Sequence, residues 1–273
     1  MTTVLVIIVY LILGLFVGFV AGAFGIGGGV VMVPSFLFLF GLHNFPHDLI
    51  PKFAIGTSLF ASVLSSSSGA YTHLKNKNID VIMGILIGSF AVLSGFFLSF
   101  VAIKLDAMSL KIIFAFVLVL VTIRLLTDKN SNDQGSDYIW KYSYYLAPLL
   151  GIIIGALSAF AGVGGGIIAV PILHYIFKLK FKKSIGTSNL IIIFSALSAT
   201  ISYIYNGVKL EINYPFALGF VFLLAAIPTG LGTLISAKWG ANFTHKSNIR
   251  LLKILFAILI LAIDLKIIFD IFG

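Results

Sequence analysis

The chain contains one glycine-rich stretch twice. The first copy reads Gly22-Ala-Phe-Gly-Ile-Gly-Gly-Gly29 and continues through Val-Val-Met-Val to Pro34. The second reads Ala159-Phe-Ala-Gly-Val-Gly-Gly-Gly166 and continues through Ile-Ile-Ala-Val to Pro171, so both copies place a proline five residues after the last glycine. One apolar glycine cluster would be weak evidence of a repeat, but a second copy in the same register predicts one.

A second motif follows each glycine stretch and supports the repeat. The sequence Ile-Gly-Thr-Ser occurs at 55–58 and again at 185–188. Because paired motifs appear in the same order, we interpret the chain as a tandem duplication. The only long hydrophilic stretch separates the two halves and is interpreted as their linker. The predicted organisation is a first membrane repeat at 1–127, a linker at 128–142 and a second membrane repeat at 143–273.

The composition predicts a membrane protein. Hydrophobic residues make up 60% of the chain and charged residues 10%, whereas soluble domains carry roughly 25% charged residues. Apolar stretches long enough to cross a hydrocarbon core of about 30 Å recur along the chain, and their continuity favours helices over a barrel. The fold class expected is an all-α polytopic membrane protein. The absence of cysteine excludes disulfides and thiolate chemistry.

Ten helical segments are expected, five in each half. The second segment of each half would rise only about 20 Å, too short for a full crossing. It therefore forms either a re-entrant loop or a short hairpin with the segment before it. The expected segments are 4–23, 30–42, 54–72, 80–102 and 109–126, then 143–161, 167–178, 184–205, 213–236 and 249–271.

Basic residues predict the orientation. The net charge is +9, and the Lys and Arg residues lie mainly in short loops between the segments. Thirteen fall on one side of the membrane and five on the other, which assigns the first side to the cytoplasm and removes the need for a nucleic-acid partner. Both termini are then outside the cell membrane and the linker at 128–142 is cytoplasmic. Each half crosses an odd number of times, so the two repeats are inverted.

The glycine stretches are the predicted substrate site. Consecutive glycines let a ligand approach the backbone, because no Cβ intervenes and positive φ is permitted. Each stretch also opens a helix, whose first N–H groups and positive dipole end favour an anion. Interrupted helices in matching positions of inverted halves are typical of transporter sites. The candidate substrate-binding residues are Gly25, Gly27, Gly28, Gly29, Thr57, Ser58, Gly162, Gly164, Gly165, Gly166, Thr187, Ser188 and Asn189, with Pro34 and Pro171 as helix-break prolines.

Packing is the alternative role for the same residues. Glycines permit close helix contact in membranes, and hydroxyls in membrane helices often bond to their own backbone. His73 and His174 are interpreted as packed histidines, and Asp264 either as a functional intramembrane acid or as a side chain that reaches the outer face. No pattern predicts a metal site or a cofactor. Packing is preferred for the glycines spaced by four, which are Gly14, Gly18, Gly22, Gly151 and Gly155.

At these paired motifs the chain resembles the sulfite exporter TauE/SafE family, also called the toluene sulfonate uptake permease family. The likeness rests on the glycine stretches 25–29 and 162–166, their prolines, and the two Ile-Gly-Thr-Ser motifs. The resemblance implies a permease for sulfite, sulfonates or related small anions, driven by an ion gradient with proton or sodium as the coupling ion. Asn189 follows the second motif where Leu59 follows the first, so the half-sites are expected to contribute unequally.

The leading hypothesis is a secondary transporter, not an enzyme, that works by alternating access of the two halves. An anion channel of the same architecture is the first alternative. An intramembrane hydrolase using Ser65 to Ser68 with His73 or His174 is a second, although no Gly-x-Ser-x-Gly elbow is present. A purely structural membrane partner is a third, and it would tolerate a bulky residue in place of Gly28.

Overall fold

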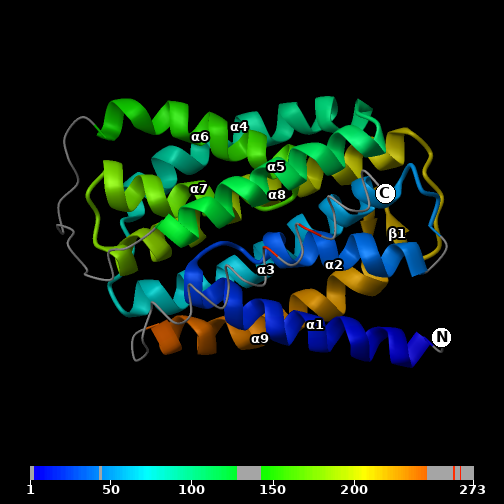
Figure 1. Cartoon of the computed structure of the whole chain (residues 1–273), viewed down its shortest axis with the longest axis horizontal. Helices are drawn as coiled ribbons and strands as arrows, with labels where there is room; N and C mark the ends of the chain where they lie inside the picture. Colours follow the sequence, from blue (N-terminus) through cyan, green and yellow to red (C-terminus); the bar gives the residue numbers. More distant parts are fainter. Residues whose placement is uncertain (1–2, 43–44, 128–142, 245–260, 262–264, 266–273) are drawn as a thin grey trace.

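The computed structural model describes residues 3–42, 45–127, 143–244, 261 and 265. Nearly all of this part is helical, and one short β-hairpin precedes the last described helix (Figure 1). The elements are α1 (Thr3–Phe24), α2 (Gly29–Leu42), α3 (Ile50–Lys75), α4 (Val81–Lys104), α5 (Ala107–Thr127), α6 (Ser143–Ala161), α7 (Gly166–Pro171), a π-helical turn (Ile172–Ile176), α8 (Phe181–Lys209), β1 (Ala217–Leu218), β2 (Val221–Phe222) and α9 (Leu223–Thr244).

The described helices confirm an all-α polytopic membrane protein. Those long and apolar enough to cross a membrane include Val4–Phe24, Val81–Lys104, Tyr144–Ala161 and Phe181–Lys209. Large apolar side chains also cover the outside of the bundle. Phe97 of α4 and Leu149 of α6, for example, leave more than half of their surface exposed. Such a surface suits lipid rather than water.

Most of the expected segments coincide with helices, but one was partly wrong. The run 213–236 was expected to be continuous, whereas its first part forms the β1–β2 hairpin and α9 begins only at Leu223. Pro215 disfavours helical backbone before it, and Gly219 adopts a left-handed φ of 56° in the turn. Hydrophobicity alone does not distinguish an apolar hairpin from a helix. The segment 249–271, Asp264 and the linker lie outside the described residues.

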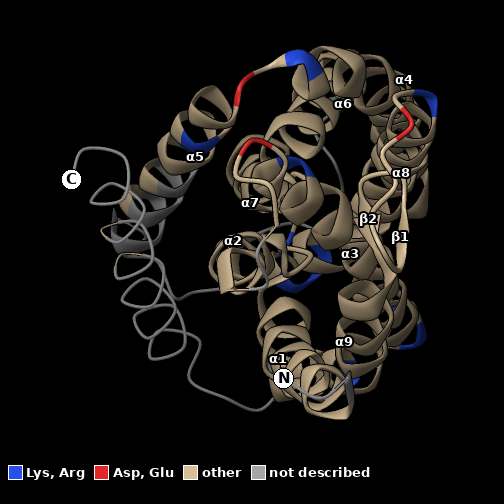
Figure 2. Ribbon diagram, turned by 90° about the vertical axis from the view of Figure 1, so that its right-hand side faces the viewer, with Lys and Arg blue, Asp and Glu red and all other residues tan. Residues whose placement is uncertain are grey.

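The two halves are interlocked rather than side by side. Helix α1 packs along α9 and α4 packs along α6, so each outer pair takes one helix from each half. Helix α3 packs against α8 between these pairs. Figure 2 shows α1 with α9 on one side of the bundle and α4 with α6 on the other, with α2, α3 and α7 between them.

Small residues let the outer pairs approach closely. Gly14 and Gly22 of α1 lie against the backbone of Thr229 and Ala237 in α9, and Gly155 of α6 lies against Ala91 in α4. Because these glycines meet partner backbone directly, they have the packing role that their spacing predicted. In each pair the contacts advance in the same direction along both helices. Helices α1 and α6 begin at opposite ends of the bundle (Figure 1).

Candidate functional site

The two glycine loops have the same backbone conformation. Three residues in each loop adopt the left-handed region, where side chains are strained and glycine is favoured. The φ angles are 68°, 74° and 79° at Gly25, Gly27 and Gly28, and 68°, 73° and 76° at Gly162, Gly164 and Gly165. Helix α2 then begins at Gly29 and α7 at Gly166. The sequence repeat is therefore also a repeat of backbone geometry.

The loops cross in direct contact. Gly29 of the first loop lies against the carbonyl of Gly162 in the second. In the matching contact, a Cβ on Gly166 would stand 2.7 Å from the carbonyl oxygen of Gly25. A side chain at Gly29 or Gly166 would therefore push the loops apart, so the third position of each triplet favours glycine although its φ is ordinary.

Each Ile-Gly-Thr-Ser motif docks on the glycine loop of the other half. Ser58 Oγ donates to the Gly162 carbonyl at 3.0 Å, and Ser188 Oγ donates to the Gly25 carbonyl at 2.9 Å. All four residues are buried. The serine hydroxyls therefore satisfy backbone carbonyls of the opposite half instead of pointing into open space.

The two threonines make a second reciprocal pair of contacts. Thr57 Oγ1 accepts from the backbone N–H of Phe222 at 3.1 Å, and Thr187 Oγ1 accepts from the backbone N–H of Asp80 at 2.9 Å. Phe222 comes directly before α9, and Asp80 directly before α4. Each threonine thus fixes the start of a helix in the other half.

The remaining predicted site residues are Asn189 and the two prolines, and their local surroundings differ. Asn189 is buried, and its side-chain amide donates to the Ile185 carbonyl one turn back in α8 at 3.2 Å. Helix α2 continues through Pro34, so that proline does not break it. At Pro171, however, α7 passes into the π-helical turn. His174 Nδ1 donates to the Leu179 carbonyl at 2.8 Å, as expected for a packed histidine.

Three hydroxyls that were not among the candidate binding residues stand out on α3. Ser62, Ser65 and Ser66 are buried, and their Oγ atoms have no hydrogen-bond partner within the described part of the chain. Ser67 and Ser68 differ, because their hydroxyls donate to the carbonyls of Val63 and Leu234, each at 2.7 Å. The run of four serines was a visible signal, but it did not distinguish satisfied hydroxyls from unsatisfied ones.

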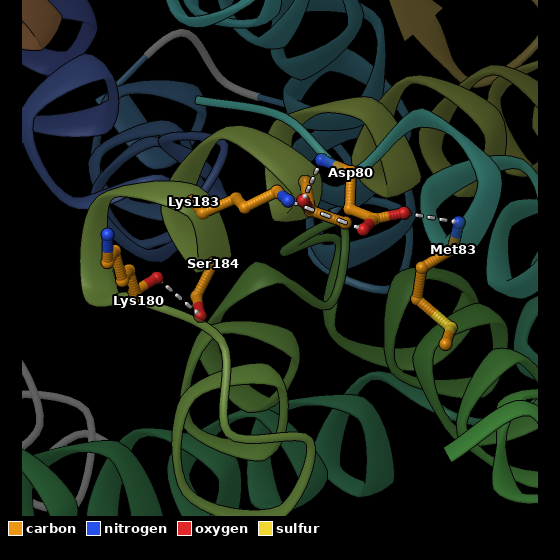
Figure 3. Close-up of polar contacts among 6 residues, drawn as sticks. Asp80, Met83, Lys180, Lys183 and Ser184 are labelled. Carbon is orange, nitrogen blue, oxygen red and sulfur yellow. Dashed lines mark hydrogen bonds and ion pairs between the residues drawn. The ribbon is translucent and has the colours of Figure 1, made fainter. Parts of the chain in front are cut away.

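An ion pair joins the two halves at one end of their contact. Lys183 Nζ of α8 lies 3.6 Å from Asp80 Oδ2. The other carboxylate oxygen of Asp80 accepts from the backbone N–H of Met83 at 3.0 Å and so caps α4. Figure 3 shows Asp80 between Lys183 and Met83, and it shows Ser184 bonded to the Lys180 carbonyl one turn back.

An aromatic cluster occupies the equivalent place at the other end. Phe222 corresponds to Asp80, since both precede a helix and donate to a threonine of the other half. Phe45 joins the halves there, with its ring centroid 4.0 Å from Tyr214, 5.1 Å from Phe222 and 5.1 Å from Phe53. The repeat thus has charged side chains at one end and aromatic side chains at the other.

Comparison with known proteins agrees with this architecture. The family model described as sulfite exporter TauE/SafE matches residues 10–267. The chain belongs to the TauE/SafE family. As a member of that family it is a multi-pass membrane transporter, which implies a small substrate and a lipid bilayer as its surroundings.

Relatives of this TauE/SafE protein carry compatible names. A probable membrane transporter protein of Methanocaldococcus jannaschii is 30% identical over 90% of this chain and 89% of its own length. The probable membrane transporter protein YdhB of Bacillus subtilis is 31% identical over 88% of this chain and 90% of its own. The probable membrane transporter protein YunE of the same organism is 24% identical over 96% of this chain and 97% of its own length. No solved structure matches the chain.

Proposed function

We propose that this TauE/SafE protein carries small sulfur-containing anions, such as sulfite or organosulfonates, by alternating access between two inverted halves. The observation that carries the proposal is the reciprocal docking of each Ile-Gly-Thr-Ser motif on the glycine loop of the other half. In this proposal the substrate passes through the crossing, where glycine backbone and hydroxyl groups of both halves gather. Sulfite export is the activity after which the family is described.

The buried polar groups favour an anion over a cation. Every buried polar side chain in the described part of the chain is a serine, threonine, asparagine, histidine or tyrosine, and none is a carboxylate, lysine or arginine. Hydroxyl, amide and backbone N–H donors stabilise negative charge, whereas a cation path usually has carboxylates. A neutral lining of donors therefore matches an oxyanion, whose oxygens accept several hydrogen bonds at once.

The arrangement of helices supports inverted halves. Helices α1 and α6 occupy corresponding places in the two repeats and begin at opposite ends of the bundle (Figure 1). With both termini outside, the end that carries Asp80 and Lys183 faces the cytoplasm and the aromatic cluster faces outward. A single cysteine at Gly135 in this cysteine-free chain should then react only with reagents applied from the cytoplasm. Labelling from outside would reverse the orientation.

Flux measurements on the purified protein test the function. The protein is reconstituted in liposomes and offered sulfite, thiosulfate, sulfoacetate, taurine and sulfate, with and without proton and sodium gradients. A carrier should show saturable uptake and faster uptake when unlabelled substrate is present on the far side. Flux without this acceleration would favour the channel alternative. No flux of any sulfur anion under any gradient would refute the proposed substrate class.

A further inference from the structure

Three buried hydroxyls on α3 lack the hydrogen bonds that buried hydroxyls require. Ser62, Ser65 and Ser66 are exposed by 0%, 1% and 0%, and none of the three Oγ atoms is bonded within the described residues. Burying a hydroxyl without a partner costs free energy, so such groups are rare unless they serve a ligand or an internal water. The position of these three serines relative to the glycine loops therefore indicates what they could bind.

The serines lie on the face of α3 that runs between the two glycine loops. Ser58, Ser62 and Ser66 are spaced by four, so they line one face at steps of about 6 Å. Ser58 reaches the second glycine loop at the Gly162 carbonyl. Ser66 reaches the first, with its Oγ 3.5 Å from the position that a Cβ on Gly27 would occupy. Ser62 consequently lies between the loops, and Ser65 lies beside it on the same face.

The equivalent face of α8 is not equivalent in chemistry. Ile192 stands where α3 has Ser62, and its side chain would meet a Cβ on Gly164 at 2.7 Å and a Cβ on Gly27 at 3.0 Å. Ser195, the counterpart of Ser65, already donates to the Gly164 carbonyl at 2.9 Å. The second half therefore supplies an apolar wall and a satisfied hydroxyl where the first half supplies unsatisfied donors.

We propose that Ser62, Ser65 and Ser66 form the substrate subsite, and that it selects a singly charged anion with a pyramidal –SO3 group. This inference rests on the proposed function. The three hydroxyls donate to the oxygens on one side of the group. Ile192, which lies beside the same Gly27 as Ser66, contacts the apolar substituent or lone-pair side.

Charge gives the selectivity. No buried Lys or Arg is present in the described part of the chain to compensate the substrate's charge. The cost of moving an ion out of water rises with the square of its charge, and three neutral donors offset it for a monoanion far better than for a dianion. Methanesulfonate and hydrogensulfite should therefore bind, whereas sulfate, with similar oxygens and two charges, should bind poorly.

Alanine variants test the subsite with an internal control. Ser62→Ala and Ser66→Ala should each raise the KM for methanesulfonate flux about tenfold, the usual effect of losing a hydrogen bond to a charged group. Their thermal stability in detergent should be unchanged or higher, because an unsatisfied buried hydroxyl is removed. Ser67→Ala, whose hydroxyl bonds to Val63 in its own helix, should leave the KM unchanged. Wild-type KM values in the first two variants, alongside working wild-type flux, would overturn the subsite and leave the proposed function standing.

Cysteine labelling decides the same question without flux. Ser66→Cys, as the single cysteine of the chain, should react faster with anionic 2-sulfonatoethyl methanethiosulfonate than with its cationic trimethylammonioethyl analogue. Methanesulfonate should slow the anionic reaction, and equimolar sulfate should not. If the residue does not react, or if neither anion or both anions protect it, the subsite is refuted even where transport is observed.

Discussion

Replacing Gly28 by alanine tests whether the left-handed glycine loop holds the fold together. The residue adopts a φ of 79°, which costs an L-residue about 1 to 2 kcal/mol. The new Cβ would also stand 2.7 Å from Val17 Cγ1 and 3.2 Å from Met32 Cε. Overpacking of this kind costs about 1 to 3 kcal/mol, so the variant should lose roughly 2 to 5 kcal/mol of stability.

Thermal unfolding of the purified protein in detergent measures this loss. Gly41→Ala, in the α2 helix that follows the loop, is a control, because nothing lies within 4 Å of a Cβ at that position. That variant should keep or slightly raise the melting temperature. Gly28→Ala should lower the melting temperature by several degrees at the least.

A double variant separates the two causes. Val17→Ala removes the Cγ1 atom that the new Cβ would meet, so Val17→Ala combined with Gly28→Ala should be less destabilised than the sum of the single variants. The loss of stability that comes from the left-handed φ at position 28 should remain in the double variant. A melting temperature for Gly28→Ala equal to that of wild type would contradict the interpretation of this loop as a strained, glycine-dependent turn.

Three further predictions concern the contacts between the halves. Ser58→Ala and Ser188→Ala should each cost about 1 to 3 kcal/mol of stability, because a buried carbonyl of the opposite half loses its donor. Equal unfolding curves for wild type and both variants would show that these two hydrogen bonds do not stabilise the contact between the halves. Asp80→Asn should cost less than about 1 kcal/mol, since asparagine keeps the helix cap and only a surface-like ion pair is lost, whereas Asp80→Ala should cost about 1 kcal/mol more in chemical denaturation. Ile192→Ser should increase sulfate affinity relative to methanesulfonate in equilibrium binding, because it adds a donor and removes the apolar wall; an unchanged ratio would argue against Ile192 as that wall.

The sequence could predict where the repeats converge but not how they connect. The glycine triplets and the Ile-Gly-Thr-Ser motifs coincide with the place where the halves are in contact, because left-handed backbone leaves a readable requirement for glycine. The hydrogen-bond partners could not be read. Ser58 bonds to Gly162 and Ser188 to Gly25, across more than a hundred residues of chain. Only the tertiary packing of α3 and α8 between the outer pairs brings those groups together.

The serine cluster was missed for a related reason. Helical spacing puts Ser62 and Ser66 on one face, but it does not say which hydroxyls find a partner. Ser67 bonds to the carbonyl four residues back, and Ser68 finds the carbonyl of Leu234 in α9. The hairpin before α9 was misread because hydrophobicity outweighed the proline and glycine within it.

In this duplicated protein, the positions where the halves differ are the better guide to function. Positions that hold the backbone repeat the same residue, because the same φ angle or the same carbonyl has to be satisfied twice, as at Ser58 and Ser188. Side chains at the other positions contact each other or a ligand, so they do not have to be the same residue in both halves. At such positions the two halves differ: Ile192 is the counterpart of Ser62, and the aromatic Phe222 is the counterpart of Asp80, which forms an ion pair. A transporter that binds one substrate between two halves needs only one set of donors. A second set on α8 would add unsatisfied buried hydroxyls without adding a contact to the anion.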